Sequence, residues 1–309
     1  MKIKWYLLVG VGMLAVTSGC TKLKTDSSVE SRKPSEKLSV VAPGAKIRKL
    51  ATGYDHLEGP AVDANGDIYF TQQRKNKIFK WLVEEKKVEL FHDNTGASNG
   101  MFVDHDGNLI ACAGDFHKLV SFDMDGNMTV LTGSYNGKPY NCTNDLWIDL
   151  KGGIYFTDPH YGRREKKMQD GEHVYYLSPD RKNVIRVIED MVRPNGIIGS
   201  PDGSLLYVAD EGADTTWVYT ILPDGTLTNK KFFADEADDG MSVDIEGNIY
   251  LTPHTIYSIS VYGPDGNKIE TIETPEQPRN LCFGGKDRQT LFITATTSLY
   301  SLRMRVKGL

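Results

Sequence analysis

The sequence has few cysteines, no excess of basic residues and no long segment of helical periodicity. Among its 309 residues are four cysteines, and 36 Lys and Arg against 41 Asp and Glu give a net charge of −5. A nucleic-acid-binding surface would be basic and clustered, so we expect no nucleic-acid partner. A Gly-Xaa-Ser-Xaa-Gly nucleophile elbow and a nucleotide-binding loop are also absent, which argues against a serine hydrolase or a nucleotide-dependent enzyme.

The apolar run at the N-terminus is too short to span a bilayer stably. Lys2 and Lys4 precede apolar residues 5–16, and small residues at 17–19 lead to Cys20. This layout is that of a cleaved export signal over residues 1–19. It resembles a bacterial lipoprotein signal, which implies that Cys20 is lipidated. An ordinary signal peptide that ends near a cysteine is the alternative. We therefore expect an exported cell-envelope lipoprotein, periplasmic or outer-membrane-anchored, which contacts the membrane through its lipid.

The segment after Cys20 is rich in Lys, Ser, Asp, Glu and Pro and lacks apolar periodicity. It predicts a flexible polar tether over residues 20–44, followed by a folded domain over residues 45–309. If Cys20 carries lipid, an odd number of cysteines remains, so not all can pair. We expect no disulfide, because these cysteines occupy similar places in different repeats and can pack as small apolar side chains: Cys112, Cys142 and Cys282.

One local signature recurs along the folded domain. An acidic or amide residue precedes a short apolar run, which is followed by a turn glycine and a second apolar run. The first residues of the six copies are separated by 41, 45, 51, 44 and 41 residues: Glu58, Asn99, Asn144, Asn195, Asp239 and Asn280. Strand-forming repeats of about 40–50 residues predict an all-β fold, a six-bladed β-propeller. A two-sheet sandwich gives no reason for six recurrences.

The two ends of the domain predict how the ring closes. Residues 46–52 form one strand before the first copy, and about three strands fit after Asn280. We expect the N-terminal strand to complete the last blade, because closure of the ring protects strand edges.

Equivalent positions of a propeller lie on one circle, so the six first residues should meet at one mouth of the central channel. All six carry a side-chain oxygen and none is positively charged. Each alone could be a turn residue bonded to its own backbone, but Glu58 is a poor turn former. Converging carboxylates and amides are unfavourable unless something satisfies them. A divalent metal does so. We expect one ion, first Ca²⁺, which prefers six to eight oxygens, with Zn²⁺, Mg²⁺ or Mn²⁺ as possible substitutes. The ring lacks His and Cys, which argues against structural zinc.

These residues resemble the SMP-30/gluconolactonase family of regucalcin-like lactonases. The matching stretches are residues 58–60, 141–145, 155–162, 193–196, 239–241 and 280–285, in order and at blade spacing. The resemblance implies that Glu58, Asn195 and Asp239 bind the metal and that Asn144 contacts metal or substrate. It also implies hydrolysis of a sugar lactone, such as gluconolactone, to an aldonic acid. Cys142 departs from the family pattern, so the sugar-specific contacts do not carry over.

The ring suits this chemistry. A metal polarises the lactone carbonyl and stabilises the negative charge that attack by water builds. Asp239 can bind the metal through one oxygen and accept the proton of water with the other. Direct attack by Asp239 is the alternative. The remaining candidates for substrate contact, besides Asn144, are Asn99, His160 and His254.

Two other functions fit the same ring. One is another metal-dependent hydrolase, acting on esters or organophosphates. The other is a non-catalytic propeller that binds partners at the cell surface, with a structural metal. For the lactonase we expect a small-molecule sugar lactone as the partner and a monomeric protein.

Overall fold

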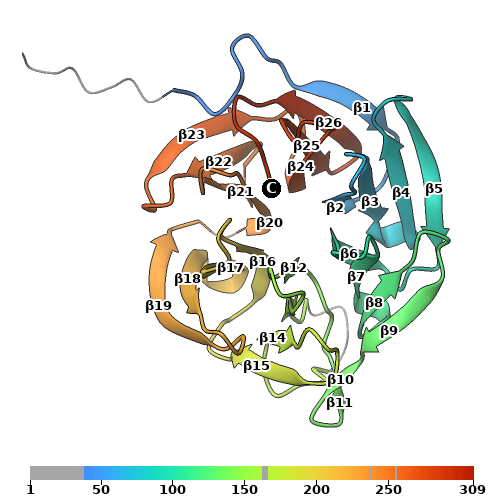
Figure 1. Cartoon of the computed structure of the whole chain (residues 1–309), viewed down its shortest axis with the longest axis vertical. Coiled ribbons are helices and arrows are strands. Elements are labelled where there is room, and N and C mark those ends of the chain that lie inside the picture. Colours follow the sequence, from blue (N-terminus) through green and yellow to red (C-terminus); the bar gives the residue numbers. More distant parts are fainter. Residues whose placement is uncertain (1–37, 162–165, 237, 255) are drawn as a thin grey trace, which may run out of the picture. The chain divides into compact units, whose positions relative to one another are not determined.

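The computed structural model describes residues 38–161, 166–236, 238–254 and 256–309. The predicted signal peptide, Cys20 and most of the predicted tether lie outside these residues. Six four-stranded antiparallel sheets are arranged around a central axis (Figure 1). The predicted all-β six-bladed propeller is therefore confirmed.

The strand nearest the axis comes first in the chain in each of the first five blades. Blade 1 contains β2 (Leu57–Val62), β3 (Ile68–Gln72), β4 (Lys77–Leu82) and β5 (Lys87–Asp93). Blade 2 contains β6 (Ser98–Val103), β7 (Leu109–Ala113), β8 (Lys118–Phe122) and β9 (Met128–Thr132). Blade 3 contains β12 (Leu146–Ile148), β13 (Ile154–Asp158), β14 (His173–Leu177) and β15 (Val184–Ile188).

The remaining blades follow the same order. Blade 4 contains β16 (Pro194–Gly199), β17 (Leu205–Asp210), β18 (Thr215–Ile221) and β19 (Leu227–Ala234). Blade 5 contains β20 (Asp238–Val243), β21 (Ile249–Pro253), β22 (Ser258–Tyr262) and β23 (Lys268–Glu273). Blade 6 contains β24 (Pro278–Gly284), β25 (Thr290–Ala295) and β26 (Ser298–Arg303). A separate small hairpin of β10 (Ser134–Tyr135) and β11 (Lys138–Pro139) lies between β9 and β12 in the chain.

The N-terminal strand β1 (Arg48–Thr52) completes blade 6, as predicted. It pairs antiparallel with β26, and Thr52 lies opposite Ser298. Blade 6 therefore combines both ends of the domain, which closes the ring and removes an open sheet edge.

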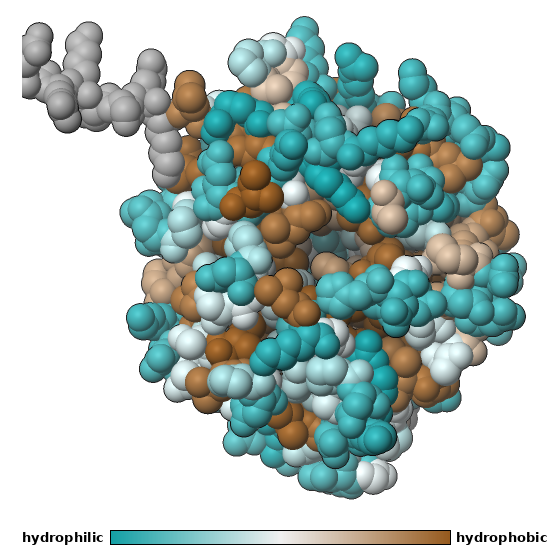
Figure 2. Space-filling model, viewed as in Figure 1, coloured by the Kyte–Doolittle hydropathy of each residue, from teal (hydrophilic) through white to brown (hydrophobic). Residues whose placement is uncertain are grey.

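The second strands are among the most buried elements of the propeller. Every residue of β3, β7, β13 and β21 is buried. Both faces of these strands pack against neighbouring blades, so their sequences are continuous apolar runs rather than alternating ones. Outer strands such as β5 are half-buried or exposed. On the face in Figure 2, hydrophilic residues prevail around the outline, and apolar patches lie both near the middle and at parts of the edge.

The folded unit begins earlier than the predicted boundary at residue 45. The compact unit starts at Ser39, and Val40 is only 2% exposed within a hydrophobic cluster of blades 5 and 6. The Val40 amide donates a 2.8 Å hydrogen bond to Glu270, and Val41 forms a β-bridge with Met304. Residues 39–44, which we call the strap, therefore belong to the propeller rather than to a flexible tether.

The helical segments of the described residues are three short 3₁₀ turns: η1 (Gln73–Lys75), η2 (Gly114–Phe116) and η3 (Glu211–Ala213). Each follows the second strand of its blade. Across the residues that the structure describes, no helix has the length and apolarity needed to span a membrane. Within the described ranges, Cys112, Cys142 and Cys282 form no disulfide with one another.

Candidate metal and catalytic centre

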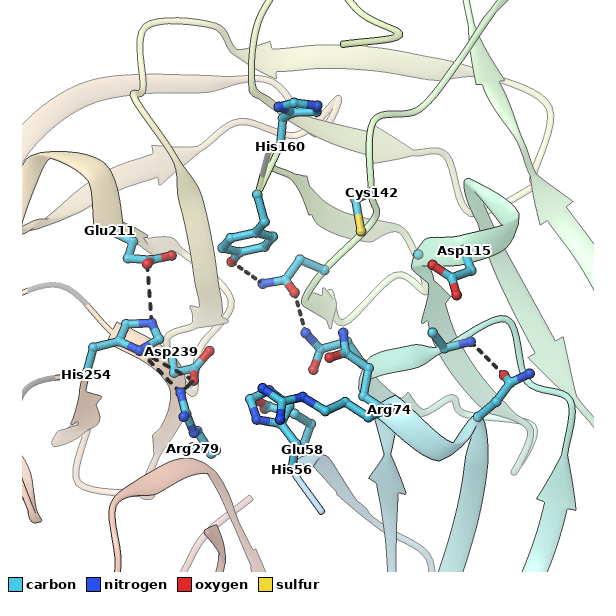
Figure 3. Close-up of a pocket in the computed structure, with 17 residues that line it drawn as sticks. His56, Glu58, Arg74, Asp115, Cys142, His160, Glu211, Asp239, His254 and Arg279 are labelled. Atoms are coloured by element: carbon cyan, nitrogen blue, oxygen red, sulfur yellow. Dashed lines mark hydrogen bonds and ion pairs between the residues drawn. The ribbon is translucent and has the colours of Figure 1, made fainter. Parts of the chain in front are cut away.

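The candidate centre is a cavity of about 330 Å³ at one mouth of the propeller channel. Its walls come from the first residues of the inner strands, including β24 of blade 6, from the 3₁₀ turns of blades 1, 2 and 4, and from loops of blades 3 and 5. Figure 3 shows the labelled side chains converging from these elements. Predicted site residues in the wall are Glu58, Asn99, Asn144, Asp239, His160 and His254.

Irregular strand pairing directs these side chains towards the mouth. The register shifts between Glu58 and Ala61 in β2, and between Asp238 and Met241 in β20. The inner strands β6 and β16 have irregularities at the same place. A β-bulge bends a strand and re-aims a side chain. Four blades therefore use one local distortion, and the ring residues in them lie within strands rather than in tight turns.

The glycines that follow ring residues allow the inner strands to meet near the axis. A Cβ on Gly59 would lie 1.9 Å from the Asn99 carbonyl oxygen, and one on Gly196 would lie 3.0 Å from the Asp239 carbonyl oxygen. Gly59 also has a positive φ of 38°, which disfavours other residues. Close approach of neighbouring blades thus explains the Glu-Gly and Asn-Gly pairs of the repeat.

An unbroken chain of side-chain hydrogen bonds links blades 2 to 5. The Asn99 amide donates to Asn144, and the Asn144 amide donates to Asn195. Asn195 in turn donates to Asp239 Oδ1 at 3.3 Å. Asn195 is almost fully buried, so it lies behind the cavity wall. It contacts Asn144 and Asp239, which line the cavity.

Glu58 is the second central carboxylate. Its side chain is 2% exposed, and His56 Nε2 lies 3.4 Å from Oε1. Burial raises the pKa of Glu58 well above its ordinary value, and the carboxylate of Asp239 raises the pKa further, against the opposing effect of Arg279. Two buried carboxylates that disfavour each other's charge can be satisfied by a cation between them.

Asp239 has partners on both of its oxygens. Besides the Asn195 contact at Oδ1, Arg279 Nη1 donates to Oδ2 at 3.2 Å. His254 Nδ1 lies 3.7 Å from the same Oδ2. Predicted as a substrate contact, His254 thus lines the cavity and also lies beside the carboxylate.

The prediction of six equivalent residues with no positive charge is wrong at blade 6. Asn280 lies deeper in the channel, in a second cavity of about 50 Å³ that it shares with Asp145. Its Oδ1 accepts a 2.7 Å hydrogen bond from the Leu281 amide. The neighbouring Arg279 occupies the mouth instead, because the irregular start of β24 differs in register from the other inner strands.

Several residues of the centre were missed from the sequence. They come from the 3₁₀ turns, from the loop before β2 and from blade 6: Arg74, Asp115, Glu211, His56 and Arg279. The 3₁₀ turns themselves recur after second strands, which is a signal that a closer comparison of the repeats could have used. Tyr161 also lines the cavity and accepts a 3.2 Å hydrogen bond from Asn144.

The donor chemistry suits a hard divalent ion. Among the cavity side chains, Glu58 and Asp239 supply carboxylates and Asn99 and Asn144 supply amides, and oxygen donors of this kind are the ligands that Ca²⁺ and Mg²⁺ prefer. Within the described ranges, no group of three or more His, Cys, Asp or Glu side chains is placed to hold a metal. Any ion here would therefore depend on the amide oxygens as well as on Glu58 and Asp239.

Comparison with known proteins places this propeller in a family. The model of the SMP-30/gluconolactonase/LRE-like region matches residues 30–297, and the chain belongs to this family. A gluconolactonase of Zymomonas mobilis is 30% identical over 298 residues, with 85% of this chain and 82% of that protein covered. The lactonase drp35 of Staphylococcus saprophyticus is 29% identical over 231 residues, with 71% and 70% covered. A solved gluconolactonase structure from Xanthomonas campestris is 29% identical with a TM-score of 0.80, covering 86% of this chain and 91% of that one.

Proposed function

We propose that the protein is a metal-dependent lactonase that hydrolyses a sugar lactone of the gluconolactone type to an aldonic acid. Gluconolactonase and lactonase relatives that cover most of the chain support lactone hydrolysis. The observation that carries the metal and the mechanism is the pair of buried carboxylates, Glu58 and Asp239, at the channel mouth beside an amide chain. Ca²⁺ is the first candidate because all the donors are oxygens.

Glu58, Asn195 and Asp239 would hold the ion, with Asn144 adjacent. When bound, the ion supplies a Lewis acid for the lactone carbonyl. Asp239 removes a proton from the attacking water as its oxygen bonds to the carbonyl carbon. The ring carbon–oxygen bond then breaks, and the proton returned by Asp239 converts the ring oxygen into the new hydroxyl group. Asn99, Asn144 and His160 line the cavity and can orient the sugar hydroxyls.

A substrate panel tests this proposal. Aldonolactones, simple aliphatic lactones, aryl esters and a phosphotriester are assayed with the native protein, before and after chelation. We expect aldonolactones to give the highest kcat/KM, and chelation to abolish it. Preferred turnover of aryl esters or phosphotriesters would identify a different hydrolase, and no turnover of any substrate would favour a binding protein.

We also propose that the protein is an envelope lipoprotein anchored through Cys20. The support is the sequence alone: two lysines, a short apolar run and small residues before the cysteine. Cys20→Ser should release the protein from membranes in cell fractionation, and should prevent incorporation of labelled fatty acid. A Cys20→Ser protein that stays with the membranes would contradict the proposal.

A further inference from the structure

Three side chains outside the predicted ligand set surround Asn195 and Asp239. Arg279 bonds Asp239, and its Nη1 also lies 3.5 Å from His254 Nδ1. His254 Nε2 lies 3.6 Å from Glu211 Oε1. Glu211 Oε2 accepts a 3.2 Å hydrogen bond from the Asn195 amide, which also donates to Asp239. The contacts therefore form a closed ring of Arg279, Asp239, Asn195, Glu211 and His254, distinct from the ring of blades. Figure 3 shows His254 between Glu211 and Asp239.

This ring separates the two oxygens of Asp239. Oδ1 faces the Asn195 amide, whereas Oδ2 faces the cationic side chain of Arg279. The Arg279 side chain is only 17% exposed and that of Asp239 only 9%, so their contact is shielded from water. A charged hydrogen bond in such a setting restrains the carboxylate more strongly than one at the surface.

Arg279 is a poor choice if the centre only has to bind a cation. A guanidinium in contact with a ligand carboxylate repels a divalent ion in the same cavity, and this repulsion is weakly screened at a buried site. Some other role must offset the repulsion. Orientation of Asp239 is such a role, because a general base must stay within hydrogen-bond reach of its proton.

We propose that Arg279 is a positioning residue that fixes the plane of the Asp239 carboxylate, and that Glu211 holds the Asn195 amide and His254 around it. Oδ1 is then directed towards the amide chain, and Oδ2 is held in place to accept the proton of water. The role of Asp239 as base rests on the proposed lactonase function. The contacts within the ring do not.

Arg279→Gln separates positioning from metal binding, because the two roles move different quantities. We expect kcat on the best lactone to fall at least about tenfold at saturating metal, with KM changed less than about threefold. We expect the metal Kd from calorimetry to stay the same or to tighten several-fold, because a repelling charge has been removed. Arg279→Lys keeps the charge but loses the planar guanidinium. It should retain more of the native kcat than Arg279→Gln, and its metal Kd should not fall below that of the native protein.

Arg303→Gln is the matched control. Arg303 belongs to β26 of the same blade and pairs with Asp287 at 2.7 Å, on exposed side chains outside the cavity. The kcat, KM and metal Kd of the Arg303→Gln protein should equal those of the native protein. An Arg279→Gln protein with native kcat, or one whose loss of kcat is fully reversed by more metal, would overturn the positioning role. A native protein that hydrolyses no lactone would instead overturn the proposed function.

Discussion

At the residue scale, the proposed chemistry depends on a carboxylate that serves two purposes. Asp239 is 7% exposed and shares a buried mouth with Glu58. Their mutual repulsion makes a cation favourable there, and the proposed mechanism uses Asp239 Oδ2, which Arg279 contacts, to accept the proton of water. The two residues should therefore respond differently to neutral substitutions of the same shape.

Asp239→Asn keeps an oxygen donor but removes the base. We expect kcat to fall by about 10²–10⁴ at saturating metal, with metal binding only weakened. Glu58→Gln is the matched variant, and its loss of turnover should be largely recovered as metal is added. Steady-state kinetics across a metal titration separates the two. Near-native turnover by Asp239→Asn would show that another group activates the water.

The residues of the centre differ in how far the sequence predicts them. Glu58, Asn144 and Asp239 begin copies of a repeat, and equivalent repeat positions must lie on one circle in a propeller. Arg279 and Glu211 are placed by register irregularities and a 3₁₀ turn. Those features depend on how neighbouring blades pack, which spacing along the sequence does not contain.

At the element scale, the strap as well as the strand β1 contributes to closure of the propeller. The strap adds a buried Val40 and hydrogen bonds to Glu270. A composition dominated by polar residues predicted a tether through residue 44. One buried apolar side chain and a β-bridge were enough to order its last residues, and neither has a periodic signature.

Truncation measures these contributions. A chain that begins at residue 39 should melt as the mature protein does. A start at residue 45 removes Val40 and should cost about 1–3 kcal/mol. A start at residue 53 removes β1 and should unfold blade 6. Thermal melts compare the three, and equal Tm values for starts at 39 and 53 would refute closure by β1.

Glu276 should make the stability of blade 6, which closes the propeller, depend on pH. Partial burial raises its pKa, but hydrogen bonds from Ser298, Thr297 and Tyr300 outweigh this effect and lower the pKa to about 2. The folded-state pKa is thus below the ordinary value of 4.5. Glu276 therefore contributes stability above pH 4.5, and this contribution is lost as the pH falls towards 2.

Glu276→Gln should accordingly lower Tm at pH 7 and make less difference as the pH approaches 3. Denaturant unfolding at several pH values checks this convergence. Glu273→Gln, on the neighbouring β23, is a control for the removal of one negative charge. A difference between Glu276→Gln and the native protein that grows on acidification would contradict the assignment.

At the scale of the whole molecule, the propeller gathers at one mouth residues that are far apart in the sequence. The number of blades, their order and the closing strand follow from six spaced copies, with one strand before the first copy and three strands in the last. The presence of Arg279 at the mouth and of the second cavity beside Asn280 could not be predicted from the sequence. The symmetry of the repeat predicts that all blades are equivalent, and blade 6 breaks that symmetry. The proposed positioning of Asp239 depends on that asymmetry, since Arg279 contacts Asp239 only in one sector of the propeller.

The most direct test of the account is turnover of an aldonolactone by the chelated protein as Ca²⁺ is added back, with binding followed by calorimetry in parallel. We predict no turnover without metal, recovery that follows the binding of one ion, and a higher Tm in the bound state by linkage. Full turnover in the presence of chelator, with no ion bound, would contradict a metal-dependent centre at Glu58, Asn195 and Asp239.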